Sequence, residues 1–225
     1  MSDDPAPAPA HILISGGEGG LARALQNEFS RDEAVVHAPG RKAMDVRDEA
    51  GINAFFSRLD RLDVLIANAG LTRDGPVTGL GADEFAEVMD TNLRGAFLCA
   101  RAALKLMVKQ RGGHIVFIGS RAARYGTRGQ SAYAAAKAGM VGLAQSLAKE
   151  YGGRNIRCNV VLPGFLETKM TGALSAERRE EVRAEHTLGR FNTVENAARF
   201  VAFLARLDHI SGQVFTLDSR IDRWT

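Results

Sequence analysis

Short apolar runs alternate with longer segments in which apolar residues recur at helical spacing, from one end of the chain to the other. Strands that alternate with helices in this way form a parallel sheet covered on both faces, so the pattern predicts a doubly wound α/β fold. The strands are expected at residues 11–15, 34–38, 63–67, 114–119, 157–161 and 214–217. The helices are expected at residues 20–30, 48–59, 82–110, 131–151, 175–185 and 194–206, with Asp48, Ser131 and Ser175 available as N-caps.

One stretch interrupts this alternation, between the second strand and the next helix. Residues 36–45 read VHAPGRKAMD, in which Pro39 and Gly40 oppose a helix. Too few residues remain for the crossover of about a dozen that normally joins parallel strands. We therefore expect a missing helix and a short third strand at 42–46, which leaves this edge of the sheet thinly covered.

Length and composition limit the class of protein. A chain of 225 residues that is 45% hydrophobic is expected to form one domain, here over residues 10–225. Residues 1–9 begin acidic and then alternate Pro and Ala, which predicts a flexible tail rather than a secretion signal. No apolar run approaches the ~20 residues of a membrane span. Cys99 and Cys158 lie in apolar runs and fit buried thiols better than a disulfide or a metal site, so we expect a cytoplasmic protein without a metal.

Basic residues are concentrated in one part of the chain. Between Thr91 and Lys149 there are ten Lys and Arg residues and no Asp or Glu, although the formal charge of the whole chain is only +3. If part of this segment is exposed, it forms a positive face suited to an anionic ligand or an acidic partner. Alternatively, acidic side chains from elsewhere pair with it. Nucleic acid is not the expected partner, because the basic residues lack interleaved aromatics and a recognisable binding module.

A glycine-rich turn follows the first strand, where residues 15–22 read SGGEGGLA before a helix begins. Glycines let backbone amides approach a pyrophosphate, and the helix N-terminus adds partial positive charge. A glycine-rich loop is often only flexible, but a preceding strand and a following helix are the setting that dinucleotide binding requires. The candidate cofactor-binding residues here are Ser15, Gly16, Gly17, Gly19, Gly20 and Leu21, together with Asn68, Ala69 and Gly70 at the end of the strand expected beside the first.

Ser120, Tyr133 and Lys137 form the set with the clearest chemistry. Ser120 follows the apolar run HIVFIG, at the carboxyl end of a central strand, where open α/β sheets bind ligands. Tyr133 and Lys137 are four residues apart in a helical segment and share one face. An ammonium beside a phenol stabilises the phenolate and lowers its pKa from about 10, which makes the tyrosine a usable acid or base. Taken alone, the pair is also compatible with a surface tyrosine and a solvated lysine.

Over residues 10–217 the chain resembles the short-chain dehydrogenase/reductase family. The resemblance rests on SGGEGGLA at 15–22, NAG at 68–70, TNLRGAF with Asn92, GS at 119–120, YAAAK at 133–137 and PG at 163–164, in order and at family spacing. It implies a single Rossmann-type domain that binds a nicotinamide dinucleotide. Within the family, the stretches LTRDG, GQSAYAAAKAGMVGLAQSLAKE, NIRCNVVLPGFLETKM and SGQVF are most similar to the 3-oxoacyl-acyl-carrier-protein reductases, although sugar, steroid and polyol dehydrogenases share parts of them.

The resemblance implies reduction of a ketone to a secondary alcohol, with a 3-oxoacyl thioester on acyl carrier protein as the expected substrate. Tyr133 would be the general acid, Ser120 would orient the carbonyl, and Lys137 would bind the nicotinamide ribose while lowering the pKa of Tyr133. Hydride that arrives at a carbonyl carbon leaves charge on the oxygen, which preplaced hydroxyl donors stabilise. The remaining implied residues are Asn92, which would hold a water in a proton relay through Lys137, and Pro163 and Gly164, which would lie beside the nicotinamide.

The same resemblance implies a homotetramer assembled through the helices at 82–110 and 131–151. Two alternatives stay open: a carbonyl reductase or alcohol dehydrogenase for small molecules, and a noncatalytic partner subunit that keeps the fold for assembly. The complete catalytic set favours a catalyst over the second alternative. After its last strand the family often has a glycine pair, whereas this chain has Asp-Ser-Arg at 218–220.

The chain also departs from the family where NADPH is distinguished from NADH. NADPH-dependent members often carry a basic residue in the glycine-rich loop, where this chain has Glu18 and Gly19. Arg41 and Lys42, just after the second strand, could replace it, and no Asp ends that strand to hold a free ribose 2′-hydroxyl. NADPH is therefore favoured over NADH. The residues expected beside the adenine are Asp45 and Val46.

Three arginines, Arg121, Arg124 and Arg128, lie between Ser120 and Tyr133, in a loop that borders the substrate entrance if both flanking residues are catalytic. The family often has smaller or apolar residues here. We expect at least one arginine to bind an anion, either the phosphate of a phosphopantetheine arm or an acidic carrier surface. The alternative is that they pair with acidic groups of a neighbouring subunit. The residues expected to extend the patch are Lys109, Arg111 and Arg154.

Overall fold

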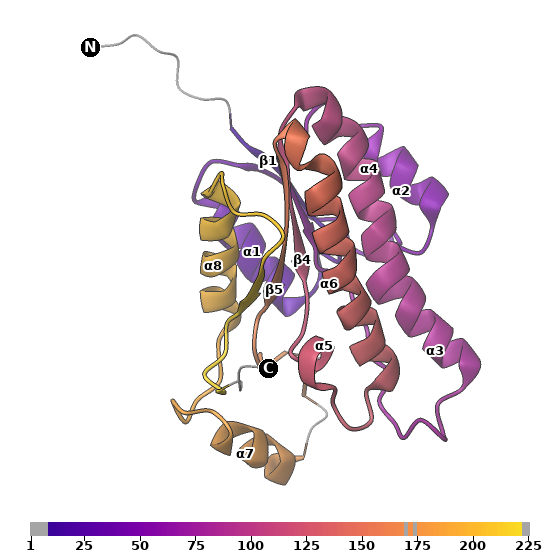
Figure 1. Ribbon diagram of the computed structural model, residues 1–225, viewed down its shortest axis with the longest axis vertical. Helices are drawn as coiled ribbons and strands as arrows, with labels where there is room; N and C mark the ends of the chain where they lie inside the picture. The colour runs from indigo at the N-terminus through magenta and orange to yellow at the C-terminus, as the bar shows by residue number, and fades with distance from the viewer. Residues whose placement is uncertain (1–8, 169–170, 173–174, 222–225) are drawn as a thin grey trace.

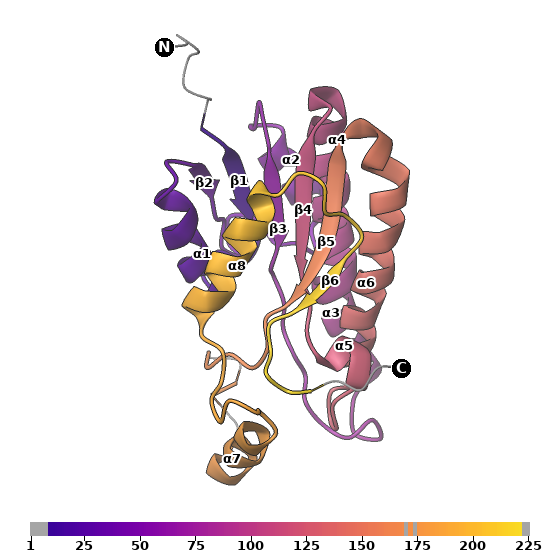
Figure 2. The same cartoon turned by 60° about the vertical axis from the view of Figure 1, so that its left-hand side comes forward.

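Six parallel strands form one sheet with helices on both faces (Figures 1 and 2). The computed structural model describes residues 9–168, 171–172 and 175–221, so residues 1–8 of the predicted tail lie outside the described residues. The order across the sheet is β2-β1-β3-β4-β5-β6. The strands are β1 (His11–Ile14), β2 (Val35–His37), β3 (Val64–Ala67), β4 (Gly113–Ile118), β5 (Ile156–Leu162) and β6 (Val214–Thr216).

Helices cover the two faces in separate layers. The helical segments are α1 (Gly20–Ser30), α2 (Glu49–Phe56), α3 (Ala82–Met89), η1 (Asp90–Arg94), α4 (Gly95–Gln110), α5 (Ala122–Tyr125), α6 (Ser131–Tyr151), η2 (Gly152–Arg154), α7 (Ala176–Ala184) and α8 (Val194–Arg206). Figures 1 and 2 show α1 and α8 together on one face, and α2, α4 and α6 on the other. Along β1, Leu13 faces the second layer, whereas Ile12 and Ile14 face the first. Burial on both faces explains why the strands read as unbroken apolar runs.

The predicted elements are confirmed with small shifts at their ends. Every predicted strand outside 42–46 forms within one residue of its expected bounds, and the helices at 20–30, 131–151 and 194–206 form as expected. Asp48 and Ser175 cap α2 and α7, because their side chains accept hydrogen bonds from the backbone of Ala50 and Arg178. Ser131 is not a cap: it is the first residue of α6, and Gln130 holds the cap position without a side-chain bond.

The predicted third strand at 42–46 is wrong, since this described segment forms turns and no strand. The carbonyl of Gly40 accepts hydrogen bonds from the backbone of Ala43 and Met44, each at 3.0 Å, so groups needed for a sheet ladder are used locally. Met44 and Val46 are nevertheless buried in the same core as α2 and α4, which explains the strand-like alternation. As predicted, no helix lies between β2 and residues 42–46, but because that strand does not form, α2 is the helix that joins β2 to β3, and β2 is an edge strand.

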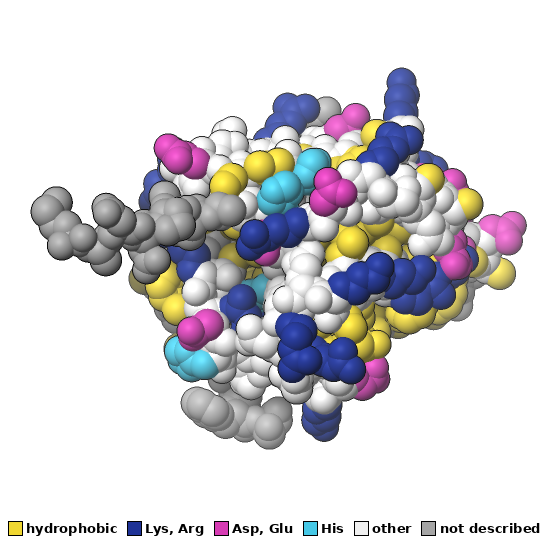
Figure 3. Space-filling view, turned by 90° about the horizontal axis from the view of Figure 1, so that it is seen from above, with side chains coloured by type: hydrophobic (Ala, Val, Ile, Leu, Met, Phe, Trp, Pro, Cys, Tyr) yellow, Lys and Arg dark blue, Asp and Glu magenta, His cyan; other side chains and the backbone are white. Residues whose placement is uncertain are grey.

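The carboxyl ends of the strands meet at one end of the molecule, the lower end in Figure 1, near α5 and α7. Figure 3 looks onto the opposite end, where several Lys and Arg side chains gather. Lys109, Arg111 and Arg154 precede β4 and β5 and so belong to this opposite end. The prediction that they extend the patch at Arg121 is therefore wrong, because the six residues of β4, about 20 Å of strand, separate the two ends. None of the described helices is long and apolar enough to cross a membrane.

Candidate active site

A cavity of about 920 Å³ opens at the carboxyl ends of the strands. This volume lies within the range of about 300–1,000 Å³ that is typical of small-molecule sites. All the predicted site residues are described, and four of them do not line the cavity: Ser15, Gly17, Lys42 and Asn92. The predicted residues that do line it are Gly16, Gly19, Gly20, Leu21, Arg41, Asp45, Val46, Asn68, Ala69, Gly70, Ser120, Tyr133, Lys137, Pro163 and Gly164.

The glycine-rich loop is shaped by close backbone contacts. Gly16 has a φ of +68°, and a Cβ on it would lie 2.9 Å from Cα of Ala69. A Cβ on Gly17 would lie 2.1 Å from the carbonyl oxygen of Ala38, so only glycine fits there. The N-cap of α1, Gly19, makes no side-chain cap bond, which leaves the first amides of the helix facing the cavity without a side-chain acceptor. Such a cradle fits an anionic pyrophosphate.

Ser15 and Asn68 act as supports behind this wall. The hydroxyl oxygen of Ser15 accepts hydrogen bonds from the backbone amides of Asn68 (3.0 Å) and Ala69 (3.1 Å). The Asn68 side chain donates in return to the carbonyl of Ser15 at 3.1 Å. These bonds tie the end of β1 to the end of β3 and hold the glycine-rich loop beside residues 68–70.

Ser120, Tyr133 and Lys137 meet on one side of the cavity. Ser120 follows β4, and its hydroxyl lies near enough to the Tyr133 phenol on α6 to lower the pKa of that phenol, although burial outweighs this effect. Lys137 lies one turn further along α6, with its ammonium 5.6 Å from the centre of the Tyr133 ring. The structure therefore brings together the three side chains that the sequence singled out, in a cavity shared with the glycine-rich loop.

The expected lowering of the Tyr133 pKa is not found. Burial raises the pKa of this phenol, the hydrogen bond with Ser120 lowers it, and the carboxylate of Asp74 raises it further. The net effect is an increase. The Lys137 ammonium is directed to another acceptor, since it donates to the carbonyl oxygen of Ile118 at 2.7 Å. Its own pKa is lowered by burial to about 8.

Asn92 explains an irregular turn in the long predicted helix at 82–110, which forms as α3, the π-helical turn η1 and α4. Its amide nitrogen donates to the carbonyls of Val88 (2.9 Å) and Leu71 (2.8 Å), and its oxygen accepts from the Leu71 amide at 3.3 Å. The Val88 carbonyl is the one that the Asn92 backbone would use in an α-helix, so the side chain replaces that bond. Next to it, a Cβ on Gly70 would lie 2.6 Å from the Asn92 oxygen and 3.7 Å from the Lys137 nitrogen. The small residue keeps this space open.

Asp74 and Gln130 also line the cavity and were not predicted as site residues. Gln130 donates a hydrogen bond of 3.0 Å to the Asp74 carboxylate, and the amide of Gly75 donates to the carbonyl of Gly129 at 2.8 Å. These contacts join the loop after β3 to the loop before α6. The sequence could have pointed to Asp74, because this residue belongs to the LTRDG stretch that resembles the reductases.

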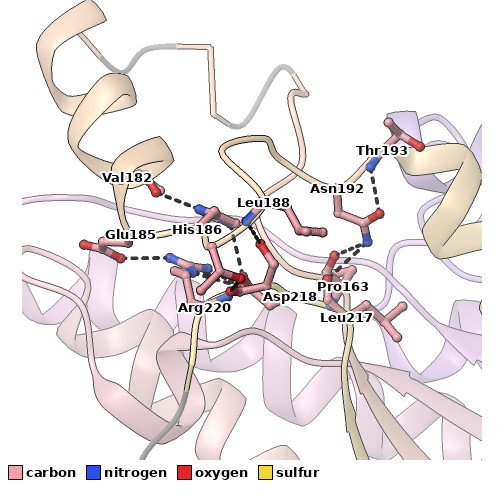
Figure 4. A network of polar contacts seen from close by, with 12 residues as sticks. Pro163, Val182, Glu185, His186, Leu188, Asn192, Thr193, Leu217, Asp218 and Arg220 are labelled. Atoms are coloured by element: carbon pink, nitrogen blue, oxygen red, sulfur yellow. Dashed lines mark hydrogen bonds and ion pairs between the residues drawn. The ribbon is translucent and has the colours of Figure 1, made fainter.

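Pro163 and Gly164 are held by the segment after β6 (Figure 4). The side chain of Asn192 donates to the carbonyls of Pro163 (2.8 Å) and Leu217 (3.3 Å). A Cβ on Gly164, which has a φ of +79°, would lie 2.5 Å from the Leu217 carbonyl oxygen. A glycine is thus required where the chain passes beside the cavity.

The residues that replace the family's glycine pair build an ionic cluster beside this point (Figure 4). His186 donates from Nδ1 to the Val182 carbonyl at 2.7 Å, and its Nε2 lies 3.1 Å from the Asp218 carboxylate. Burial raises the pKa of Asp218, but hydrogen bonds and charge from Arg220 outweigh it and lower the pKa overall. Arg220 also forms part of the cavity wall. No local sequence pattern indicates that it would share a cavity with the glycine-rich loop.

At the far end of the cavity, two arginines surround Asp45. Arg47 donates to both carboxylate oxygens, and Nε of Arg41 donates to Oδ2 at 3.2 Å. Hydrogen bonds from Arg47 lower the pKa of Asp45, against the effect of burial. Arg41 lines the cavity as predicted, whereas Lys42 does not.

The arginines between Ser120 and Tyr133 separate into two groups. Arg121 and Arg128 line the cavity, and the Arg121 guanidinium lies 4.1 Å from the centre of the Tyr125 ring. Arg124 lies on the exposed side of α5 and is not a lining residue. Within the described part of the chain, neither Arg124 nor Arg128 forms an ion pair.

Neither a metal-binding cluster nor a disulfide is found among the described residues. No group of three or more His, Cys, Asp or Glu side chains is placed there to hold a metal ion. Cys99 and Cys158 are free and buried as predicted, and burial raises the pKa of each thiol to about 12.

Comparison with known proteins agrees with this geometry. Residues 18–219 match a family model described as enoyl-(acyl carrier protein) reductase. The chain is 35% identical to a 3-oxoacyl-[acyl-carrier-protein] reductase of Thermotoga maritima, in an alignment that covers 92% of this chain and 95% of the relative. It is 38% identical to the reductase of that name from Aquifex aeolicus (93% and 86% covered) and 40% identical to that of Escherichia coli (86% and 88% covered).

Proposed function

The chain belongs to the short-chain dehydrogenase/reductase family and is a nicotinamide-dependent oxidoreductase, and from this premise we propose that it reduces the ketone of a 3-oxoacyl thioester to a secondary alcohol. The observation that carries the proposal is that Ser120, Tyr133 and Lys137 line the same cavity as the glycine-rich loop. The names of the relatives support the substrate class. The family description names an enoyl substrate, so the test below includes one.

The side chains act on the carbonyl oxygen. The chemistry that a nicotinamide would supply, when it is bound in this cavity, is hydride transfer to the carbonyl carbon. Tyr133 donates its phenolic proton to the oxygen, and the Ser120 hydroxyl donates a hydrogen bond to it. The raised pKa of Tyr133 keeps the phenol protonated at neutral pH, which suits an acid. A water in the space beside Gly70, between Asn92 and Lys137, would return the proton to the phenolate that is left.

The preferred cofactor in this proposal is NADPH. The glycine cradle and the amides of α1 would hold the pyrophosphate, and Lys137 the nicotinamide ribose. Arg41 lines the far end of the cavity, where a 2′-phosphate would need a cation, and no acidic side chain ends β2. Lys42 does not line the cavity, so Arg41 alone keeps this role. Asp45 and Val46 would flank the adenine.

We further propose that the substrate arrives on acyl carrier protein, in the cytoplasm, and that the enzyme is a homotetramer through α3, α4 and α6. The relatives' names support the carrier, and Arg128 offers a cation at the cavity. Light scattering on the purified protein would measure the assembly.

A cofactor-consumption assay tests the reaction. The panel contains NADPH and NADH against 3-oxoacyl and 2-enoyl thioesters, carrier-bound and free, and small ketones. Tyr133→Phe should lower ketone turnover by about 10² to 10⁴ while cofactor binding is retained. Turnover of the enoyl thioester without the 3-oxoacyl one would overturn the proposed substrate, and turnover of small ketones alone would point to a small-molecule reductase.

A further inference from the structure

We propose that Glu18 is a specificity residue that disfavours the 2′-phosphate of NADPH and favours the 2′-hydroxyl of NADH. It thereby limits the preference for NADPH that Arg41 supplies. The inference rests on the proposed use of a nicotinamide cofactor. It adds a second residue that determines cofactor choice at the ribose 2′ position, with a charge opposite to that of Arg41.

The glycine-rich loop lies directly on the turn after β2. The amide of Gly17 donates a hydrogen bond of 3.0 Å to the carbonyl of Pro39. This contact brings the next residue, Glu18, over Gly40: a Cβ on Gly40 would lie 2.5 Å from the carboxyl carbon of Glu18. Glu18 also lines the cavity. Its carboxylate therefore occupies the space in which a side chain at residue 40 would stand.

In other dinucleotide-binding sheets, the corresponding space holds the side chain that binds the cofactor ribose. An acidic residue about 20 positions after the glycine motif, at the end of the second strand, accepts a hydrogen bond from the ribose 2′-hydroxyl. In this chain the corresponding residues are Ala38, Pro39 and Gly40, none of which has a polar side chain. The Glu18 carboxylate reaches the same place from the opposite side, so the glycine-rich loop provides the acid that β2 lacks.

The charges around Glu18 leave its carboxylate available. Arg41 and Arg47 are both hydrogen-bonded to Asp45. Among the described residues, Glu18 has neither a hydrogen bond nor an ion pair with another side chain. An ionised carboxylate only accepts hydrogen bonds, so it suits a hydroxyl and repels a phosphate.

Calorimetric titration of the full chain with NADP⁺ and NAD⁺ tests the proposal without requiring turnover. Glu18→Gln keeps the shape and removes the charge, and it should tighten NADP⁺ binding about tenfold while NAD⁺ binding stays equal or weakens. Glu150→Gln is the matched control, because it removes one exposed carboxylate of α6 that does not line the cavity. An unchanged ratio of the two dissociation constants in Glu18→Gln, or the same change in the control, overturns the proposal.

A second variant addresses the position of the carboxylate rather than its charge. Gly40→Ala should displace the flexible Glu18 side chain and shift the ratio in the same direction, and it should add nothing further in the Glu18→Gln background. Equal effects of Gly40→Ala in both backgrounds contradict the proposed contact. Wild-type protein that binds neither dinucleotide overturns the proposed function itself, which is a different result from an unchanged ratio.

Discussion

The ammonium of Lys137 donates a hydrogen bond to the carbonyl oxygen of Ile118, 2.7 Å away. Ile118 is the last residue of β4, and Ser120 follows it closely, so this bond fixes α6 against the strand end that carries Ser120. Lys137 is buried, and burial disfavours its charged form and lowers its pKa to about 8. Keeping this buried lysine charged at neutral pH therefore lowers the folding stability of the protein.

Lys137→Met removes the buried charge and keeps a chain of similar length. The lysine has a pKa of 10.5 when solvated and about 8 in the fold, so between these values the unfolded state binds more protons. The stability of the wild type should therefore rise relative to the variant as pH increases through this window, by up to about 3 kcal/mol. Urea unfolding across the window measures the difference. A difference in unfolding free energy that does not change with pH would contradict the lowered pKa.

Asp74 is expected to contribute, in addition to burial, to the pH dependence of the reaction in the oxidation direction, which needs the Tyr133 phenolate. The Asp74 carboxylate raises the pKa of Tyr133, so Asp74→Asn should move the alkaline rise in alcohol oxidation to lower pH. Gln130→Ala removes the hydrogen bond to Asp74 but keeps the charge, so its profile should stay in place. A rate profile that moves equally in both variants would mean that Asp74 acts only by holding the loop. Asp74→Glu should restore the original profile.

The glycine-rich loop offers a matched pair of substitutions. In Gly17→Ala the new methyl would lie 2.1 Å from the Ala38 carbonyl, a backbone atom that cannot easily move. We expect a lower melting temperature and weaker binding of both dinucleotides. In Gly19→Ala the nearest atom is 3.5 Å away, an ordinary contact, so stability should change by less than about 1 kcal/mol. Calorimetry measures the melting temperature of both variants, and titration measures their affinity for each dinucleotide. Equal losses in the two variants would show that the close contact at Gly17 is not the cause.

Local patterns in the sequence predicted most of the fold and the centre of the site. The strands are buried on both faces, so each was visible as a short apolar run. Tyr133 and Lys137 share a helix face, and Ser120 follows a strand at the edge where ligands bind. Each of these relationships is set by neighbouring residues, and each is present in the structure.

The errors come from turns and contacts that the hydrophobic pattern and the spacing of residues do not reveal. Met44 and Val46 alternate like a strand, but Gly40 takes the backbone amides of this segment into a turn. The pKa of Tyr133 depends on burial and on Asp74, neither of which the spacing of Tyr133 and Lys137 reveals. Arg220 lines the cavity and is bonded to Asp218, which only the fold places against His186.

Arg128 and Arg124 provide the test of carrier recognition at the cavity entrance. Both are exposed and close in sequence, but only Arg128 lines the cavity. If the substrate brings an anion to this point, Arg128→Ala should raise KM for a carrier-bound 3-oxoacyl thioester about threefold, whereas Arg124→Ala should have a smaller effect. The loss in Arg128→Ala should shrink at high salt, because screening weakens the same attraction in the wild type. A small neutral ketone has no anion to lose, so its KM should stay within error. Equal losses for both substrates, or a change in assembly on light scattering, would instead indicate that Arg128 supports the structure or a neighbouring subunit.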